Sequence, residues 1–326
     1  MANVKMNYME AIRDGLRVAM KKDERVYIFG EDVGFYGGVF GVTKGLFEEF
    51  GPRRVRNTPL SENAIIGEAM GAALAGLRPV PEVQFSDFVT VCMAPLVDVM
   101  GTYRYRFGVN IPVVIRMPSG GGMSIGPFHS KSLEAWFVHA PGFKIVMPST
   151  PTDAKGLMLA AIEDPDPVIY MEHKRLYNLV SEEVDDGYFT TPLSAGVVKR
   201  EGTHVTLITY GATVALALEA AKQLSSEGID LEVIDLRTIW PMDEALVLAS
   251  VKKTNRVIVL HEAVKIGGFG GEIVARICEQ AFGYLAAPPL RIGAKHTPPP
   301  VHPVLEKVYL PSLDGVVNAA RSLMQY

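Results

Sequence analysis

The chain has 326 residues, enough for two domains of ordinary size that each bury a hydrophobic core. Its hydrophobic share of 48% excludes a disordered chain, and its net charge of −4 provides no basic stripe for a nucleic-acid partner. With only two cysteines, we expect neither a disulfide framework nor a metal site. No apolar run is long enough to span a membrane and no signal-peptide pattern is visible, which predicts a cytoplasmic protein without a membrane partner.

Strand and helix patterns alternate from the start of the chain. A helical period follows Asn7, a β-rich run covers residues 25–29, and the segment 30–43 is too rich in glycine for regular structure. Ligands of open α/β sheets bind where strands end, so this segment is a candidate binding loop. A plain surface loop is the alternative.

Residues 62–76 predict a helix built mostly of Ala, Gly, Ile and Met, and its first residue is the carboxylate Glu62. Small residues on nearly every face indicate a buried helix. An acid in a first turn usually does no more than interact with the helix dipole. Beside an apolar helix and without a basic neighbour in sequence, however, an acid is desolvated, and a carboxyl group so placed can hold and return a proton near neutral pH. Glu62 is therefore a catalytic candidate.

Further strands are predicted at 81–85 and 111–116, with a long helix at 88–107 between them. The loop that follows, 117–132, contains four glycines and His129. A histidine on a loop held by a rigid strand is a better functional candidate than a histidine in a core. A solvated loop residue is the alternative.

A polar stretch at 186–195 predicts a linker between two domains, at 1–185 and 196–326. Strands and helices alternate again after the linker, so we expect an α/β protein with mostly parallel sheets covered on both faces. The sequence GGFGGE at 267–272 opens a helix and could cradle a phosphate, but a tight strand-to-helix crossing is the favoured interpretation. From the residues alone, a proton-transfer enzyme with an organic cofactor and a purely structural partner subunit both stay open.

Several long motifs resemble one protein family over essentially the whole chain. They are TPLSE before the small-residue helix, FHSKSLEAW, PSTPTDAKGLMLAAIEDPDPVIY, YGATV and VIDLRTIWPMD. The chain resembles the β subunit of the thiamine-diphosphate-dependent first component of 2-oxo acid dehydrogenase complexes, of the pyruvate, branched-chain 2-oxo acid or acetoin type. The resemblance implies a pyrimidine-binding, transketolase-like domain followed by a transketolase C-terminal-like domain.

The same resemblance implies partners and an activity. In that family an α subunit completes a two-α, two-β heterotetramer and holds magnesium and the cofactor's diphosphate, while the β subunit holds the aminopyrimidine. The absence of a GDG…N diphosphate motif here agrees with this division. We expect oxidative cleavage of a small 2-oxo acid or acetoin, with the acyl group passed to lipoamide of an acyltransferase core. The alternative is a non-catalytic assembly subunit, and the substrate stays open, although GGVFGVTKGL resembles acetoin-type relatives most.

The resemblance also assigns roles to residues. Glu62 would hydrogen-bond a pyrimidine ring nitrogen, and His129 would serve acyl transfer to lipoamide. Three residues would line the pyrimidine: Leu60, Gln84 and Phe88. Four fall where relatives bind a structural potassium ion, a cation that prefers oxygen ligands: Val113, Ala161, Asp164 and Asp166. Lys131 stands where relatives usually carry glutamine, and adds a positive charge close to His129 in sequence.

Overall fold

The computed structural model describes residues 3–326, which form two compact units. The first contains the chain up to Ser119 together with Trp136–Leu193. The second contains Gly120–Ala135 together with Ser194–Tyr326. The glycine-rich loop that carries His129 therefore belongs to the second unit, although it directly follows a strand of the first.

The first unit is built on a parallel sheet with neighbouring strands in the order β6-β7-β5-β4-β2-β3. These strands are β2 (Val26–Gly30), β3 (Val55–Asn57), β4 (Arg78–Glu82), β5 (Val114–Ser119), β6 (Lys144–Val146) and β7 (Val168–His173). Every residue of β2, β5 and β7 is buried, as expected for parallel strands that helices cover on both faces. The predicted parallel α/β sheet is confirmed.

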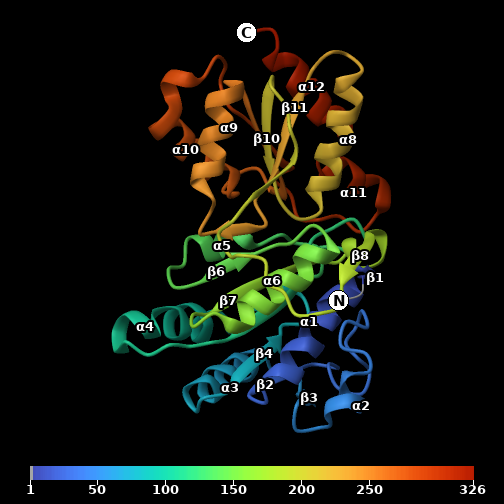
Figure 1. Cartoon of the computed structure of the whole chain (residues 1–326), viewed down its shortest axis with the longest axis vertical. Helices are drawn as coiled ribbons and strands as arrows, with labels where there is room; N and C mark the ends of the chain where they lie inside the picture. Colours follow the sequence, from blue (N-terminus) through green and yellow to red (C-terminus); the bar gives the residue numbers. More distant parts are fainter. Residues whose placement is uncertain (1–2) are drawn as a thin grey trace. The chain divides into compact units, whose positions relative to one another are not determined.

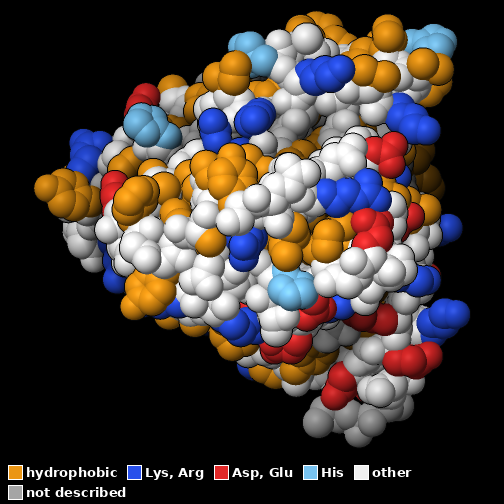
Figure 2. Space-filling view, turned by 90° about the horizontal axis from the view of Figure 1, so that it is seen from above, with side chains coloured by type: hydrophobic (Ala, Val, Ile, Leu, Met, Phe, Trp, Pro, Cys, Tyr) orange, Lys and Arg blue, Asp and Glu red, His pale blue; other side chains and the backbone are white. Residues whose placement is uncertain are grey.

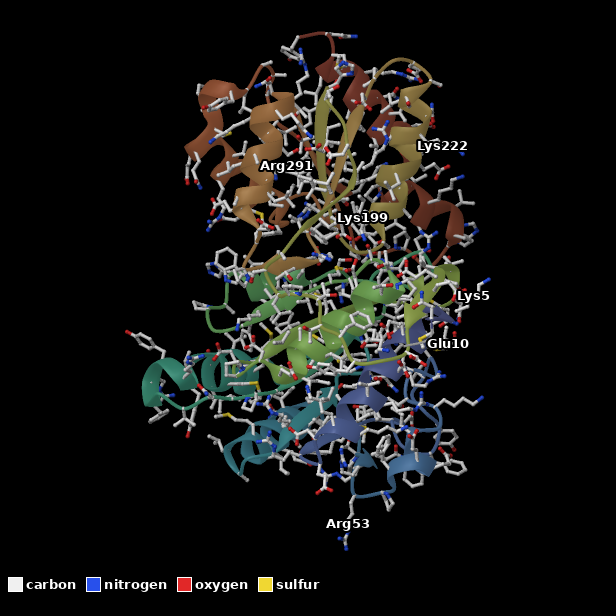
Figure 3. The ribbon with its side chains drawn as sticks, in the orientation of Figure 1. Lys5, Glu10, Arg53, Lys199, Lys222 and Arg291 are labelled. Carbon is white, nitrogen blue, oxygen red and sulfur yellow. The ribbon has the colours of Figure 1, made fainter. Side chains whose placement is uncertain are left out.

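Helices surround this sheet (Figure 1). They are α1 (Tyr8–Lys22), α2 (Leu46–Phe50), α3 (Glu62–Leu74), α4 (Gly101–Phe107), α6 (Pro151–Glu163) and α7 (Leu176–Leu179), while α5 (Glu134–Val138) begins in the second unit. As predicted, Asn7 caps α1: its side chain accepts the amide of Glu10, and its own amide donates back to the Glu10 carboxylate. Glu10 and Lys5 are labelled near the start of the chain in Figure 3. The buried face of α1 packs against α6.

Two parts of the first unit differ from the sequence-based expectation. The predicted long helix at 88–107 is a 3₁₀ segment (Ser86–Cys92), a π-helical segment (Ala94–Met100) and then α4. Pro95 explains part of this change, because proline removes one amide donor from a helical ladder. In addition, β1 (Asn3–Asn7) and β8 (Ser181–Asp185) form an antiparallel pair that was not predicted, because β8 is polar and half exposed.

The second unit has the strand order β14-β13-β10-β11-β9, in which only β9 is antiparallel to its described neighbour. Its strands are β9 (Val197–Arg200), β10 (Val205–Thr209), β11 (Leu231–Asp235), β13 (Val257–Val264) and β14 (Leu290–Ala294), with β12 (Thr238–Trp240) after β11. Its helices are α8 (Thr213–Ser225), α9 (Glu244–Thr254), α10 (Gly270–Ala281), α11 (Pro303–Tyr309) and α12 (Leu313–Leu323). In Figure 1, α8 and α12 lie on one side of β10 and β11, and α9 and α10 lie on the other.

The surface carries charges of both signs. Figure 2 shows Lys and Arg side chains interspersed with Asp and Glu side chains on the face seen from above. Of the helices in residues 3–326, none combines the length and the apolar character that a bilayer crossing requires.

Candidate functional site

The central candidate, Glu62, is the first residue of α3 and is only 5% exposed. The prediction that the structure buries this acid is therefore confirmed. One face of α3 packs inside the first unit through Ile65, Ile66, Ala69, Met70 and Ala73. The prediction of a buried helix is wrong for the other face of α3, where Ala64, Gly67 and Gly71 are exposed. A Cβ added at either glycine would meet no atom of residues 3–326 within 4 Å.

A second buried acid, Glu31, lies within electrostatic range of Glu62. Glu31 directly follows β2 and is 7% exposed. Burial, followed by the negative charges of Glu62, Asp32 and Glu82, raises the pKa of Glu31 to about 7. Its buried Oε1 atom accepts no hydrogen bond from any residue in the range 3–326. The first unit therefore contains a carboxyl group that can hold a proton at neutral pH.

A buried guanidinium neutralises two other acids of the same sheet. Arg116 on β5 is fully buried and donates from Nη1 to Glu82 on β4 at 2.6 Å. Its Nε and Nη2 atoms donate to the two oxygens of Glu172 on β7 at 2.6 and 2.8 Å. The hydroxyl of Tyr177 donates to Glu172 at 2.7 Å. These charge-assisted bonds tie three neighbouring strands together. Glu31 and Glu62 take no part in them, and neither forms an ion pair with a residue in the range 3–326.

The residues expected to line a pyrimidine differ in exposure. Leu60, in the turn before α3, is 80% exposed, whereas Gln84 and Phe88 are half buried. The Phe88 ring lies edge-on to Phe85, with 5.9 Å between centroids. Near them, burial and the Glu62 charge raise the pKa of the Cys92 thiol to about 12, which makes this cysteine unreactive.

His129 lies in the loop of the second unit and is half buried. Its amide donates to the carbonyl of Gly126 at 3.2 Å, which closes a tight turn. The Lys131 ammonium lies 5.9 Å from the centroid of the Phe128 ring, so the added charge of this lysine is directed partly toward an aromatic face.

Comparison with known proteins identifies the family of this chain. Residues 4–180 match the family described as the transketolase pyrimidine binding domain, and residues 194–316 match the transketolase C-terminal domain. Three similar proteins come from Bacillus subtilis (strain 168): 2-oxoisovalerate dehydrogenase subunit beta (43% identical), pyruvate dehydrogenase E1 component subunit beta (46%) and acetoin:2,6-dichlorophenolindophenol oxidoreductase subunit beta (44%). The alignments cover 98%, 98% and 97% of this chain and 99%, 99% and 96% of the relatives.

The chain belongs to the E1 β-subunit family of 2-oxo acid and acetoin dehydrogenases. The family resemblance, the two transketolase-type domains and the oxidoreductase class predicted from the sequence are confirmed. The fold is shared with a split-gene transketolase, described as an inactive β4 tetramer, at a TM-score of 0.78 and 21% identity over 98% of both chains.

The four residues expected to bind potassium lie directly before β5 (Val113), in the last turn of α6 (Ala161) and directly after α6 (Asp164 and Asp166). The carbonyl oxygen of Val113 already accepts the amide of Val168 at 2.9 Å, and that of Ala161 accepts the amide of Asp164 at 3.2 Å. Lys144 Nζ lies 2.6 and 2.7 Å from the two oxygens of the Asp164 carboxylate, and Arg104 forms an ion pair with Asp166. Because basic side chains already neutralise both carboxylates, those oxygens do not fit as ligands of a bare cation, and binding through the carbonyl oxygens stays a prediction.

A cavity of about 560 Å³ in the first unit lies away from the candidate site. Val26 and Arg78, at the beginnings of β2 and β4, line it together with Lys22 and Glu163 at the ends of α1 and α6. Glu31 and Glu82 lie at the opposite, carboxyl ends of these same strands. Its basic and acidic side chains pair with one another, as in Lys22 with Glu163 at 2.8 Å and Arg25 with Asp23 at 2.7 Å.

Sequence reasoning missed several polar residues of the site. Glu31 and Glu82 stand where strands end, so the rule that ligands bind at carboxyl ends could have identified them. No local signal marks Arg116, the last residue of the strand predicted at 111–116, or Glu172 on β7 as members of a charge cluster. No sequence signal marks Glu306, whose carboxylate contacts the His129 loop.

Proposed function

We propose that this chain is the catalytic β subunit of a thiamine-diphosphate-dependent 2-oxo acid or acetoin dehydrogenase, and that Glu62 holds the proton of the cofactor's pyrimidine ring. The observation that carries the proposal is the burial of Glu62 at the start of α3, without an ion pair and beside the proton-holding Glu31. An acid so placed is available to a polar ligand atom.

The residues around Glu62 fit an aromatic heterocycle. Half-buried Phe88 and Gln84 offer a ring face and an amide, and exposed Leu60 offers apolar surface. When bound, thiamine diphosphate supplies a nucleophilic carbon and accepts the electron pair that is released when the bond next to the substrate carbonyl breaks. Glu62 would hydrogen-bond a pyrimidine nitrogen and move the proton there, and Glu31 would limit the negative charge of the pocket by staying partly protonated.

A second polypeptide completes the proposed site. The relatives are named β subunits, and this chain lacks the diphosphate motif. We propose that an α subunit holds magnesium and the diphosphate in a two-α, two-β heterotetramer. Among residues 3–326, no group of three or more His, Cys, Asp or Glu side chains is arranged to hold a metal ion. The unpaired thiols of Cys92 and Cys278 support a reducing, cytoplasmic location.

The substrate is proposed only as a class, a small 2-oxo acid or acetoin. The three relatives are named for 2-oxoisovalerate, pyruvate and acetoin. Their identities to this chain, 43%, 46% and 44%, differ too little to choose one of the three substrates. Turnover of the complex with each substrate and a dye as electron acceptor would separate the three. For the acyl group, we propose that His129 serves transfer to a lipoyl domain of an acyltransferase core.

The central test is the substitution Glu62→Gln in the complex with its α subunit. Glutamine keeps the shape of the side chain but cannot exchange the proton. Hydrogen–deuterium exchange at the thiazolium carbon of the bound cofactor should therefore slow by a factor on the order of 10²–10⁴.

Glu219→Gln on α8 is the matched control, because this glutamate is exposed on the second unit. Equal exchange rates in Glu62→Gln and the wild type would leave Glu62 as a partner of the helix dipole and refute the proposal. The alternative, a non-catalytic assembly subunit, predicts that the α subunit alone turns over substrate.

A further inference from the structure

The loop that carries His129 is fastened by carboxylates that come from much later in the chain. Glu306 on α11 is 3% exposed, and its Oε1 atom accepts the amide of Gly122 at 2.7 Å. Its Oε2 atom accepts the amide and the hydroxyl of Ser124 at 2.9 and 3.0 Å. One buried side chain thus makes three charge-assisted hydrogen bonds to one loop, all within the second unit.

A second carboxylate ties the two ends of the loop together. Glu262 on β13 accepts the amide of Gly121 at 2.6 Å and the hydroxyl of Ser132 at 3.3 Å. The amide of Gly120 also donates to the carbonyl of Lys131 at 3.0 Å, across the base of the loop. Both stems are therefore fixed, and the residues between them form a closed loop.

The tip of the loop packs against the segment that leads into α11. Gly126 has a φ of +76°, a left-handed conformation that favours glycine, and accepts the His129 amide. A Cβ added at Gly126 would lie 2.7 Å from Cγ2 of Val301, so the backbone there approaches Val301 closely. The region around α11 supports the stem through Glu306 and the tip through Val301.

We propose that Glu306 is a positioning residue for acyl transfer, which fixes the loop of residues 120–132 so that the His129 imidazole is held in one orientation, with Glu262 as the second anchor. The inference rests on the proposed role of His129. A loop with four glycines has many conformations available when free, and ordering it costs conformational entropy. Because the carboxylate contacts order the loop before the reaction, less conformational entropy is lost in the transition state, and the rate of acyl transfer increases.

The first experiment uses the assembled complex with its α subunit and the substitution Glu306→Gln. Glutamine keeps the size of the side chain, but its amide nitrogen cannot accept the bonds from Ser124. We expect acylation of an isolated lipoyl domain to fall by a factor on the order of 10–100, while dye-coupled turnover stays nearly unchanged. Ser124→Ala, which removes one of the three bonds, should give a smaller loss in the same assay, and Lys307→Gln, at an exposed site on the same helix, should give none.

Two further measurements separate this inference from the proposed function. In a double-mutant cycle, Glu306→Gln should cost little acylation when His129 is already alanine, because it acts through that side chain. Amide exchange at residues 120–132 in the chain alone should accelerate in Glu306→Gln and not in Lys307→Gln, whatever the chain catalyses.

Amide exchange and the double-mutant cycle test separate parts of the inference. Unchanged amide exchange would show that Glu306 does not hold the loop and would overturn the inference. Faster amide exchange with additive losses in the cycle, or with equal losses in both half-reactions, would overturn the positioning of His129. If His129→Ala leaves acylation intact, the proposed role of His129 fails and the inference fails with it, while the exchange data still report whether the carboxylate holds the loop.

Discussion

The side chains Glu31 and Glu62 form an acidic pair that the first unit does not neutralise. The buried guanidinium of Arg116 is used by Glu82 and Glu172. Burial disfavours the ionised form of Glu31, and the negative charges of Glu62, Asp32 and Glu82 add to this effect. The pKa of Glu31 is raised to about 7, so about half of the molecules carry the proton at neutral pH.

Replacing Glu31 by glutamine should therefore stabilise the chain in alkaline solution. Because the folded-state pKa of about 7 lies above the ordinary value of 4.5, the stability that is fully present below pH 4.5 is lost as the pH rises through 7. The full shift corresponds to about 3 kcal/mol, and solvent screening makes the loss smaller than that. Urea unfolding should show that the free-energy difference between Glu31→Gln and the wild type grows in favour of the variant from pH 4.5 to about 8.

Glu24→Gln, at an exposed position just before β2, is the control and should follow the wild type at every pH. A pH-independent difference between Glu31→Gln and the wild type would contradict the raised pKa of Glu31.

The sequence could predict single residues only where local signals suffice. Burial of Glu62 follows from the apolar helix that it begins. The acidic pair does not, because it depends on the parallel register of β2 and β3, which sets Gly30 opposite Asn57 and brings Glu31 and the turn that leads to Glu62 to the same end of the sheet. A register between separate strands cannot be read from one stretch of sequence.

At the scale of secondary-structure elements, the end of β13 and the start of α10 are organised around the imidazole of His261. A Cβ added at Gly268 or Gly293 would lie 2.6 or 2.9 Å from its Cε1 atom, and one at Gly270 would lie 2.7 Å from its Nε2 atom. These glycines therefore make room for a buried ring of the same unit. This contact favours the tight strand-to-helix crossing over a phosphate cradle at 267–272.

His261 should make the stability of the fold sensitive to acid. Burial, with a smaller contribution from Arg291 on β14 (Figure 3), lowers its pKa from 6.5 to about 4, although the Ala263 carbonyl lies 3.1 Å from Nδ1 and opposes the shift. The unfolded state then binds a proton more readily than the folded state between these two pH values. Stability is complete above pH 6.5 and falls by about 3 kcal/mol as the pH drops to 4.

The substitution His261→Asn removes this titration while keeping an amide that can donate to the Ala263 carbonyl. Its overall stability should be lower because of the lost ring, but the fall of its unfolding free energy between pH 6.5 and 4 should be shallower than that of the wild type. His296→Gln, at an exposed position, should keep the slope of the wild type. Equal slopes in all three proteins would show that His261 is not the titrating group.

Strands could be predicted from the sequence where they are fully buried, because such strands are composed almost entirely of apolar residues. The continuous apolar runs at β5 and β10 identify strands because both faces of a parallel sheet are covered. The strands β8 and β9 escape this rule: they lie at sheet edges, are largely half exposed and pair antiparallel. Hydrogen bonding to a neighbour, rather than their own composition, defines them.

At the scale of the whole molecule, chain order and compact units do not coincide. Residues 120–135 belong to the second unit because Glu262 and Glu306 bind the loop, more than one hundred residues later in the chain. The sequence pattern contains no trace of such contacts. The sequence predicts the two α/β units and the burial of Glu62, but not the two carboxylates that bind the loop around His129.

The molecule also leaves an exposed face in the first unit, formed by Ala64, Gly67 and Gly71 on α3 and by Ala75 directly after it. Glycine within a helix costs about 1 kcal/mol relative to alanine, and no close contact with the described residues, 3–326, explains that cost at either glycine. Small side chains allow another backbone to approach closely. The face therefore suits the proposed partner subunit.

The substitution Gly67→Leu tests this surface. A Cβ at Gly67 meets nothing within 4 Å, so the isolated chain should fold normally and gain up to about 1 kcal/mol from better helix propensity. In the heterotetramer, the same side chain would occupy the space of the partner's backbone and should weaken assembly with the α subunit, measured by sedimentation velocity of the mixed subunits. Gly283→Leu is the matched control, because that glycine is equally open but lies in the second unit. If both variants assembled as readily as the wild type, the exposed face of α3 would not be the contact surface.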